Sequence, residues 1–239
     1  VIERLDITNI DWSNVDNYIQ IFRDMYACEK IVGLNEFIPK ATVLANANTY
    51  LFYQCKELKF SGTENNLDVN FGSTWNNAPL SLVGMFYGYG RNLTPGSEGD
   101  VPNLLNANTS TVTSMQIMFY LAKFNSSLAP IVENFDMSSL VGIGLNSFMQ
   151  NTVGTTTLDG TNWNITSALT QMNGTWRSCT DLTSILFHTS SDFSGITTWA
   201  NCFLGSDALT SIFFPLNMSF ASVTTMISFL STGVSIITG

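Results

Sequence analysis

Two stretches of this chain have the same form and stand 27 residues apart. LTQMNGTWRSCTDLTSI (169–185) and ITTWANCFLGSDALTSI (196–212) both end on the letters LTSI. A fixed period of about 20–50 residues is the signature of a solenoid or another repeat array. We therefore predict that the two stretches are successive turns of one coil. The apolar columns at period 27 are positions 118, 145, 172, 199 and 226; 149, 176, 203 and 230; 131, 158, 185 and 212; and 128, 155, 182, 209 and 236.

The first half of the chain follows the same plan with looser spacing. The extra residues of its longer units fall in Gly-rich and polar stretches, which are typical of loops. We predict one solenoid domain over residues 1–239, with about eight repeats of about 27 residues and loop insertions near 61–78 and 87–100. The units of the first half open at Ile2, Ile31, Leu58 and Leu93, and Leu128 joins the regular series.

Each unit contains two kinds of local pattern. LTSILF (182–187) alternates apolar and small polar residues, which predicts a short strand. Ahead of it, Leu169, Met172, Trp176 and Cys179 are spaced by three and four residues, which predicts one face of a short helix. One strand and one helix per unit give an α/β leucine-rich-repeat plan. We expect short parallel strands on the concave face of the array and short helices on its convex face.

The letters of several units resemble a known repeat family. LDITNIDWSNV (5–15), FYQCKEL (52–58) and WRSCTDLTSI (176–185) are similar to the repeat of BspA-like leucine-rich-repeat surface proteins. Members of that family are found among bacterial surface lipoproteins, secreted adhesins, protist surface proteins and phage-encoded proteins. The resemblance implies adhesion or protein binding without catalysis, at an extracellular, cell-surface or virion location.

Charge is scarce and unevenly distributed. Only 11 % of the residues are charged, against about 25 % in typical proteins. Residues 1–123 hold 20 of the 27 charged side chains, and Arg177 is the single basic residue after position 123. The sparsely charged half indicates a surface that lies against another chain or works outside the cell, or else a lineage with a preference for Asn and Thr.

The overall charge and hydropathy exclude several classes of partner. A net charge of −9 with nine basic residues argues against nucleic acid, whose phosphates require clustered Lys and Arg, and against anionic membrane surfaces. No apolar run is long enough to span a bilayer, so we expect no membrane insertion. No signal peptide or initiator Met is visible, and we expect the array to be part of a longer chain or assembly.

Residues capable of metal or acid–base chemistry are few. His188 is the single histidine and no Cys-x-x-Cys pair exists, so we predict no metal site and no cofactor. The carboxylate pairs Asp6 with Asp11 and Glu133 with Asp136 could form an acid and a base, but we favour a turn role for Asp11 and Asp136. We therefore predict that the chain is not an enzyme.

The four cysteines are expected to be structural. Cys28, Cys55 and Cys179 share the form Cys-x-x-Leu/Ile, which places them at one slot of the repeat. Free, buried thiols are the favoured interpretation, because Cys is among the most buried residue types. A disulfide between Cys179 and Cys202, in adjacent units, is the alternative that remains open.

A binding face can be predicted from the strand pattern. Residues that flank the inward slots of each strand point away from the core, and three of them are apolar, which suggests an interaction surface. The alternative is that a loop or a subunit covers these residues, so that they belong to the core. The candidate binding residues are Arg4, Asp6, Asn35, Val132, Asp159, Leu186 and Phe213.

Two functions remain open at this point. The first is surface adhesion or recognition, in which the array binds a protein or glycan on a cell or virion exterior. The second is a structural subunit of a larger assembly, such as a phage virion, a tail fibre or a surface layer, that packs against other chains through its low-charge half.

Overall fold

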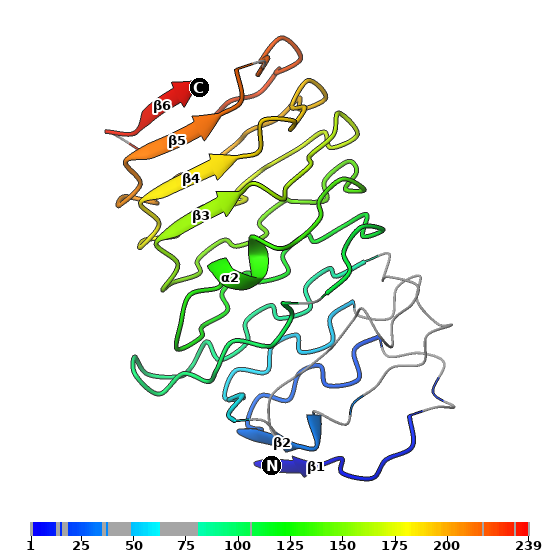
Figure 1. The fold of residues 1–239 in the computed structure, drawn as a ribbon. Helices are drawn as coiled ribbons and strands as arrows, with labels where there is room; N and C mark the ends of the chain where they lie inside the picture. Colours follow the sequence, from blue (N-terminus) through cyan, green and yellow to red (C-terminus); the bar gives the residue numbers. More distant parts are fainter. Residues whose placement is uncertain are drawn as a thin grey trace.

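The chain is wound into a parallel β-solenoid of about seven turns (Figure 1). The computed structural model describes residues 2–12, 15, 19–34, 37, 49–62, 81–105, 107–216, 218–231 and 233–238. The two ends of the chain lie at opposite ends of the stack of coils. The prediction of a solenoid is confirmed. The predicted mixture of strands and helices is wrong, because the described residues contain a single four-residue α-helix.

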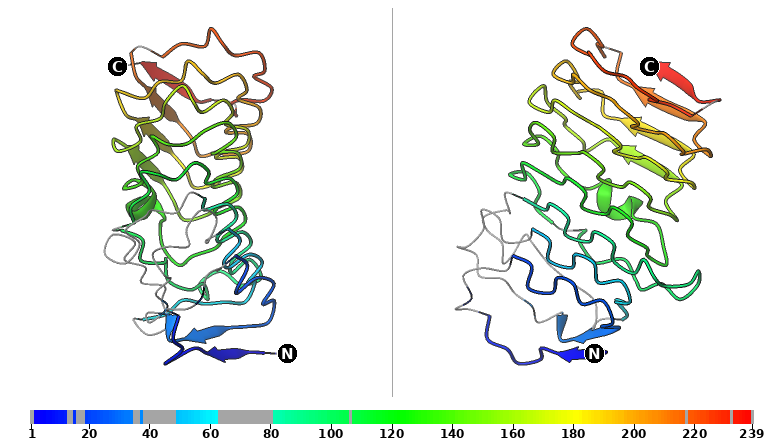
Figure 2. Two further views of the ribbon diagram at one scale, coloured as in Figure 1. Left: turned by 90° about the vertical axis from the view of Figure 1, so that its right-hand side faces the viewer. Right: turned by 180° about the vertical axis from the view of Figure 1, so that it is seen from behind.

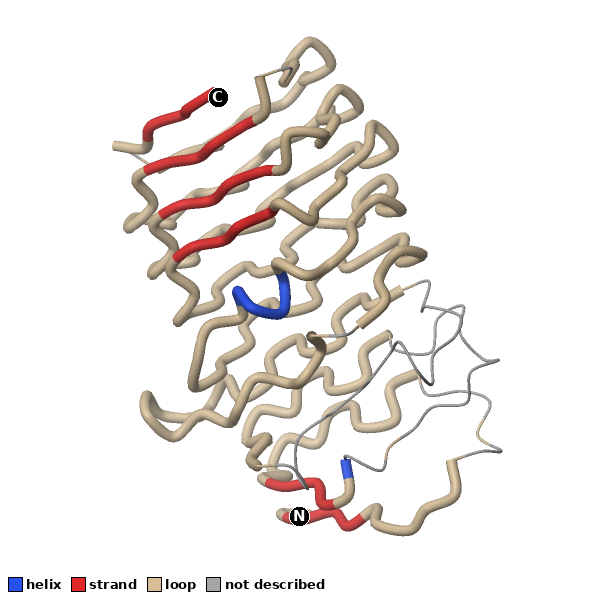
Figure 3. Tube along the Cα trace, in the orientation of Figure 1, coloured by secondary structure: helices blue, strands red, loops and turns tan. Residues whose placement is uncertain are grey.

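One wall of the solenoid, the strand wall, carries the β-strands. β1 (Arg4–Asp6) pairs with β2 (Lys30–Val32) in a two-stranded parallel sheet. A four-stranded parallel sheet follows in the order β3-β4-β5-β6, visible as the upper row of strands in Figure 3. The strand expected within 182–187 is confirmed as β4. The bounds of the four strands are Thr157–Gly160, Ser184–Phe187, Ser211–Phe214 and Ser235–Thr238.

The opposite wall, the turn wall, replaces the predicted helices with a chain of tight turns. In each coil, two residues four positions apart have a positive φ, which no right-handed helix permits. Every second N–H bonds within its own coil, as Arg177 N does to Gly174 O, whereas Trp176 N bonds to Cys202 O of the next coil. The backbone thus alternates between local turns and the neighbouring coil. The pairs with positive φ include 50 and 54, 84 and 88, 117 and 121, 147 and 151, 174 and 178, and 201 and 205.

Most hydrogen bonds between coils in the tight turns of the turn wall run in one direction. Phe22 N donates to Leu51 O, and near the other end of the stack Phe203 N donates to Phe229 O. Within the tight turns the earlier coil supplies most donors and the later coil most acceptors, whereas bonds where the wall ends can run the other way, as from Gly90 N to Cys55 O and from Lys123 N to Tyr89 O. The repeated profile of this wall can be followed in both views of Figure 2. The turn wall therefore has a donor side that faces the C-terminus and an acceptor side that faces the N-terminus.

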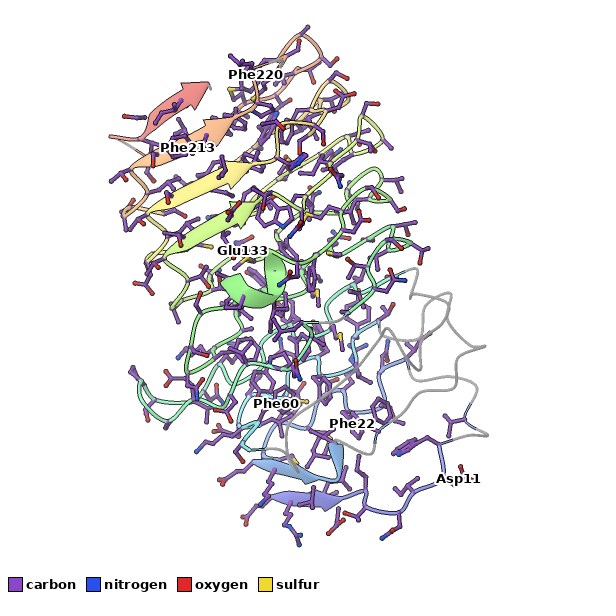
Figure 4. All side chains as sticks on the ribbon, viewed as in Figure 1. Asp11, Phe22, Phe60, Glu133, Phe213 and Phe220 are labelled. Carbon is purple, nitrogen blue, oxygen red and sulfur yellow. The ribbon has the colours of Figure 1, made fainter. Side chains whose placement is uncertain are left out.

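Aromatic rings fill the space between the two walls. Phe22, Phe52, Phe86 and Phe119 stack in sequence with ring centroids 5.3, 5.6 and 5.5 Å apart and interplanar angles of 13° or less. The same column continues as Trp176 stacked on Phe203, with centroids 5.3 Å apart. Offset stacking adds to the free energy of burial, about 0.5–1.5 kcal/mol per pair. One continuous core therefore extends from Ile7 to Phe229 (Figure 4, where Phe22 and Phe60 are labelled).

Two columns differ in register from the sequence prediction. Met115 N bonds to Gly144 O, so Leu145 follows Met115 in its column, and Met118 belongs to the column of Phe148. Ile236 pairs with Ile212, 24 residues earlier, and not with the column of Leu209. The strict period of 27 thus holds on the turn wall from about residue 145 to residue 230 and on the strand wall from about residue 158 to residue 214, because the remaining segments differ in length.

The helix α2 (Ala129–Val132) occupies the place where the period predicts a strand around Ile131. Pro130 lies in its first turn, where a missing N–H costs nothing, whereas proline removes a donor from a strand ladder. Val132 is completely buried, and its carbonyl accepts a 2.8 Å hydrogen bond from Nε1 of Trp163. The prediction that Val132 points outward is therefore wrong.

The turn geometry predicts changes in stability at Ser178 that have the opposite sign from those expected in a helix. Ser178 has a φ of 56°, in the left-handed region that strains residues with a Cβ atom. We expect Ser178→Gly to raise the free energy of unfolding by about 0.5–1 kcal/mol and Ser178→Val to lower it by at least about 1 kcal/mol. Urea denaturation measures both changes. In a helix interior Ser178→Gly would be destabilising, so a loss of stability in that variant contradicts the turn geometry.

Two tryptophans provide a matched pair for the buried hydrogen bond. Both Trp163 and Trp176 are fully buried, but only the indole N–H of Trp163 has a hydrogen-bond partner. We expect Trp163→Phe to destabilise the fold by about 0.5–1.5 kcal/mol more than Trp176→Phe, because it removes a buried hydrogen bond to the Val132 carbonyl, which keeps only the N–H of Phe135 as a partner, while both changes remove similar ring volume. Thermal unfolding of the two variants tests this, and equal losses would contradict it.

Candidate functional site

The outer face of the four-stranded sheet carries a continuous apolar row. The parallel register places Leu186 beside Phe213 and Phe213 beside Ile237. Leu186 and Ile237 are each 38 % exposed, and Phe213 is half-buried (Figure 4). Neighbouring strands lie about 4.8 Å apart, so the three side chains form one contiguous strip. We call Leu186, Phe213 and Ile237 the apolar row.

The alternation of side chains along each strand produces this face. Leu158, Ile185 and Ile212 point inward and are 2 % exposed or less, so their neighbours in sequence point outward. Small hydroxyl residues flank the apolar row, because Ser184 and Ser211 occupy the outward position two residues before Leu186 and Phe213. The sheet thus presents bulky apolar and small polar side chains in parallel strips.

Threonine hydroxyl groups fix the spacing of these coils. Thr183 Oγ1 donates to Thr156 O at 2.8 Å, and Thr210 Oγ1 donates to Thr183 O at 3.0 Å, each across 27 residues. An equivalent pair joins Thr197 to Thr170 on the way to the turn wall. These hydroxyl groups satisfy backbone carbonyls between coils and hold the outward-facing rows in register.

Carboxylate groups border the apolar row at one end. Asp159 is the outward residue of β3 beside Leu186, and it is exposed. Its N–H donates to Glu133 Oε1 at 2.7 Å, and its Oδ1 accepts the N–H of Thr161 at 3.0 Å. The site is therefore an apolar strip on β4, β5 and β6 with an acidic boundary at β3.

The structure brings together only some of the residues predicted from the sequence. Asp159, Leu186 and Phe213 lie side by side in the register of the four-stranded sheet. Arg4 and Asp6 lie on β1 in the separate two-stranded sheet, where they form an exposed ion pair of 3.1 Å. Val132 is buried in α2, and Asn35 lies outside the described residues.

Ile237 is a member of the apolar row that the sequence prediction missed. The period of 27 aligns Ile236 with Leu182 and Leu209, whereas the sheet aligns Ile236 with Ile185 and Ile212. The signal that could have found it is the letter pattern, because SIIT (235–238) matches SILF and SIFF when the last unit is allowed to be three residues shorter.

The carboxylates weighed as catalytic groups have backbone partners. Asp136 Oδ1 accepts the N–H of Ser138 at 2.9 Å, which confirms its predicted turn role. Asp6 accepts the N–H of Thr8 in the same way, and hydrogen bonds from the Thr8 side chain and then its backbone lower the pKa of the Asp6 carboxyl below its ordinary value. Asp192 repeats the arrangement with Ser194, whose side-chain and backbone hydrogen bonds lower the pKa of the Asp192 carboxyl as well. The turn role of Asp11 stays a prediction.

His188 follows directly after β4 and lies in a polar turn. Its Nδ1 accepts the N–H of Ser190 at 3.0 Å and lies 2.5 Å from the Ser190 hydroxyl group. The same hydroxyl group lies 2.9 Å from Asn164 Oδ1. Within the described residues, no group of three or more His, Cys, Asp or Glu side chains could hold a metal ion.

All four cysteines are buried and free, which confirms the favoured interpretation over a disulfide between Cys179 and Cys202. Cys179 Sγ donates to Met149 O at 3.1 Å, and Cys55 Sγ donates to Phe22 O. Burial raises the pKa of Cys55 and of Cys179 to about 12. These thiols therefore act as hydrogen-bonding core residues.

The outer face of the turn wall carries a second arrangement, a row of half-buried tyrosines in the N-terminal half of the stack. Tyr53, Tyr87 and Tyr120 lie one above another with ring centroids 4.5 and 4.9 Å apart. The guanidinium group of Arg23 lies 4.8 Å from the centroid of Tyr53 and extends this tyrosine row by a cation–π contact. Irregular spacing along the chain concealed this row from the sequence analysis.

Comparison of the chain with family models, with curated proteins and with solved structures found no match. In the part of the chain that the structure describes, no helix combines the length and the apolar character needed to cross a membrane.

The buried thiols give a prediction about reactivity and pH. At about pH 8, we expect native Cys55 and Cys179 to resist alkylation by iodoacetamide and to react once urea unfolds the chain, because the thiolate is the reactive form. The folded pKa is raised above the ordinary value of 9.0. The corresponding stability is therefore complete below about pH 9 and declines as the pH rises toward 12. Mass spectrometry of the alkylated chain measures the first effect, and rapid labelling of the native protein would contradict it.

Proposed function

We propose that this solenoid is a non-catalytic recognition module that binds a protein or glycan target through the outer face of the strand wall. The supporting observation is the apolar row of Leu186, Phe213 and Ile237, which lies in register on a sheet face that no other described segment covers. Clustered exposed apolar residues with a polar rim commonly mark interaction sites.

The geometry of the strand wall supports a binding role for a physical reason. Inter-coil hydrogen bonds hold the backbone beneath the apolar row, so little conformational entropy is lost when a partner binds. The small hydroxyl side chains of Ser184 and Ser211 lie beside the row and can donate to a partner. The acidic boundary at Asp159 favours partners with basic or neutral groups at that end.

The resemblance to BspA-like surface proteins points in the same direction as the exposed row. We propose a location outside the cell, on a cell surface or on a virion, where the sparsely charged, Asn- and Thr-rich surface of the second half of the chain faces the medium. Some polar side chains of this surface also satisfy backbone groups. For example, the carboxamide oxygen of Asn146 accepts a 2.9 Å hydrogen bond from the N–H of Asn173.

Substitution of the apolar row tests the proposal. We expect Phe213→Ser and Leu186→Ser to weaken binding about tenfold or more, because the centre of an interface carries most of its binding energy. The probes are a panel of immobilised glycans and a panel of intact bacterial and eukaryotic cells, with the fluorescently labelled chain as the reporter.

Ile143→Ser is the matched control. Ile143 is 44 % exposed, but it lies in the segment that leads into the turn wall, away from the four-stranded sheet. This variant should bind like the original chain. If the original chain binds a probe and all three variants bind it equally, the strand wall is not the recognition surface.

A further inference from the structure

The tyrosine row on the turn wall is a surface of inner coils. Tyr53, Tyr87 and Tyr120 belong to three successive coils, and hydrogen bonds join each of these coils to a neighbour on both sides. The three side chains are half-buried, so part of each ring contacts solvent. Their exposure therefore belongs to the wall itself and does not depend on where the stack ends.

The rings of the row are held in a fixed arrangement. Tyr53 stacks on Tyr87 with an interplanar angle of 20°, and Tyr120 follows with an angle of 49°. Tyr50 meets Tyr53 edge to face, and a Cβ atom at Gly84 would lie 2.5 Å from the Tyr50 ring, so glycine at this position lets that ring lie against the backbone. Neighbouring rings cover much of one another's faces, which leaves ring edges and phenol hydroxyl groups for a partner.

These hydroxyl groups are available as hydrogen-bond donors. The phenols of Tyr53, Tyr87 and Tyr120 form no hydrogen bond with another described residue. Burial, followed by the two neighbouring tyrosines, raises the pKa of the Tyr87 phenol above its ordinary value of 10.0, so the group stays protonated at neutral pH. Aromatic ring edges also carry partial positive charge. The row therefore favours oxygen-rich, negatively charged partners.

Basic side chains gather around the row although the whole chain is acidic. The turn-wall segments 20–28, 50–57, 84–92 and 117–123 contain four basic and two acidic residues, a local charge of +2 in a chain with a net charge of −9. More distant carboxylates are largely screened, because the Debye length is about 8 Å at physiological ionic strength. The basic residues are Arg23, Lys56, Arg91 and Lys123, and the acidic residues are Asp24 and Glu57.

Both of these carboxylates already have partners. Asp24 accepts hydrogen bonds from Arg23 at 3.1 Å and from the Tyr26 hydroxyl group at 3.0 Å. Glu57 accepts the side-chain amide of Asn92 at 2.9 Å. Neither carboxylate is therefore directed at the other cations of the wall.

Lys56 and Arg91 are the two cations that remain for a ligand. Lys56 Nζ lies 4.4 Å from the centroid of the Tyr26 ring. Cδ of Arg91 would lie 3.4 Å from a Cβ atom at Gly88, the residue directly after Tyr87. Within the described residues, neither cation forms an ion pair. Their ammonium and guanidinium groups can therefore bind the anionic groups of a partner.

We propose that the tyrosine row, together with Lys56 and Arg91, is a second binding surface that takes an acidic polysaccharide with carboxylate or sulfate groups. The coils repeat at about the length of one sugar residue, so an extended glycan that runs along the stack places successive sugars beside successive phenols. The hydroxyl groups bind sugar oxygens, and the two cations bind the acidic groups. This surface is separate from the apolar row of the strand wall.

The stacking of the tyrosines disfavours nucleic acid at this surface. Proteins hold single strands largely by stacking bases on exposed aromatic faces. The faces of Tyr53 and Tyr87 are turned toward each other with ring centroids 4.5 Å apart. A sugar chain uses ring edges and hydrogen-bond donors instead, and these are the groups that the row presents.

Binding of defined polysaccharides tests the proposal. The probes are heparin, which is sulfated, polygalacturonate, which is carboxylated, and amylose, which is neutral, each immobilised for biolayer interferometry. We expect the original chain to bind at least one acidic polymer, with an affinity that falls as salt is raised, and not to bind amylose. The double variant Lys56→Gln/Arg91→Gln should bind about tenfold more weakly, and Tyr87→Phe, which loses one hydroxyl group, about threefold more weakly.

Arg4→Gln/Lys30→Gln is the matched control. It makes the same change in net charge at two exposed residues that are paired on the neighbouring strands β1 and β2 of the strand wall. This control and Phe213→Ser should both bind the acidic polymer like the original chain. Far-ultraviolet circular dichroism checks the fold of each variant, and Tyr87→Phe keeps the stacked ring in place.

Three outcomes would overturn the proposal. The first is that neither acidic polymer binds at low salt. The second is an equal loss of affinity in the matched control and in Lys56→Gln/Arg91→Gln, which would indicate attraction by overall charge. The third is a single-stranded DNA oligonucleotide that binds as tightly as the polysaccharides through the same residues, which would make this a nucleic-acid surface.

Discussion

Backbone hydrogen bonding between neighbouring coils is the constraint on which the rest of this structure depends. A β-solenoid coil cannot bury its apolar face or pair its backbone groups alone, so both tasks fall to its neighbours. On the turn wall every second N–H leaves its own coil, and this alternation requires left-handed residues at regular intervals. The stacked aromatic core and the outward rows then follow from the position of each residue within a coil.

The same constraint accounts for the unusual composition. Threonine, serine and asparagine bond to backbone groups one coil away, as Thr224 does to Thr197 O and Ser206 does to the N–H of Cys179. A side chain used in this way must be polar and also short, whereas lysine and glutamate are polar but long. The scarcity of charge in the second half therefore has a structural cause, beyond the surface explanations that the sequence suggests.

The sequence allowed the repeat and much of the inward-facing pattern to be predicted, because burial imposes apolar residues at fixed intervals. Leu158, Ile185 and Ile212 were placed correctly, and so were the outward positions of Leu186 and Phe213. The helix prediction failed for an identifiable reason. Apolar residues spaced by three and four also arise when a turn-rich wall directs alternate positions inward, so Met172 and Trp176 fit both structures.

The information that distinguishes these structures lies in the small residues. The left-handed column at 147, 174, 201 and 228 reads Ser, Gly, Asn and Ser, and the column at 151, 178 and 205 reads Asn, Ser and Gly. Glycine and asparagine tolerate a positive φ, but serine gives no such signal by itself. In the second half of the chain the columns read across coils reveal the constraint, whereas in the first half the larger residues Tyr50, Ile117 and Leu121 occupy the same left-handed positions and conceal it.

Departures from the period were the other source of error, and they have local causes. Pro130 favours the first turn of α2 over a strand ladder, and this removes Val132 from the outer face. The segment before β6 is three residues shorter than the preceding one, and this moves Ile236 and Ile237 to different rows. Each departure lies at a junction where a coil changes length, because the hydrogen-bond register, and not the residue count, determines which side chains meet.

A directional ladder also affects how such a solenoid behaves as a whole. Because most bonds of the tight turns point the same way, each coil presents mainly donors to the coil after it and mainly acceptors to the coil before it. Nearest-neighbour coupling of this kind makes coil formation cooperative along the stack, as in other repeat arrays. The proposed recognition by the strand wall then uses outward side chains alone, because the backbone groups of these coils are already paired with neighbouring coils.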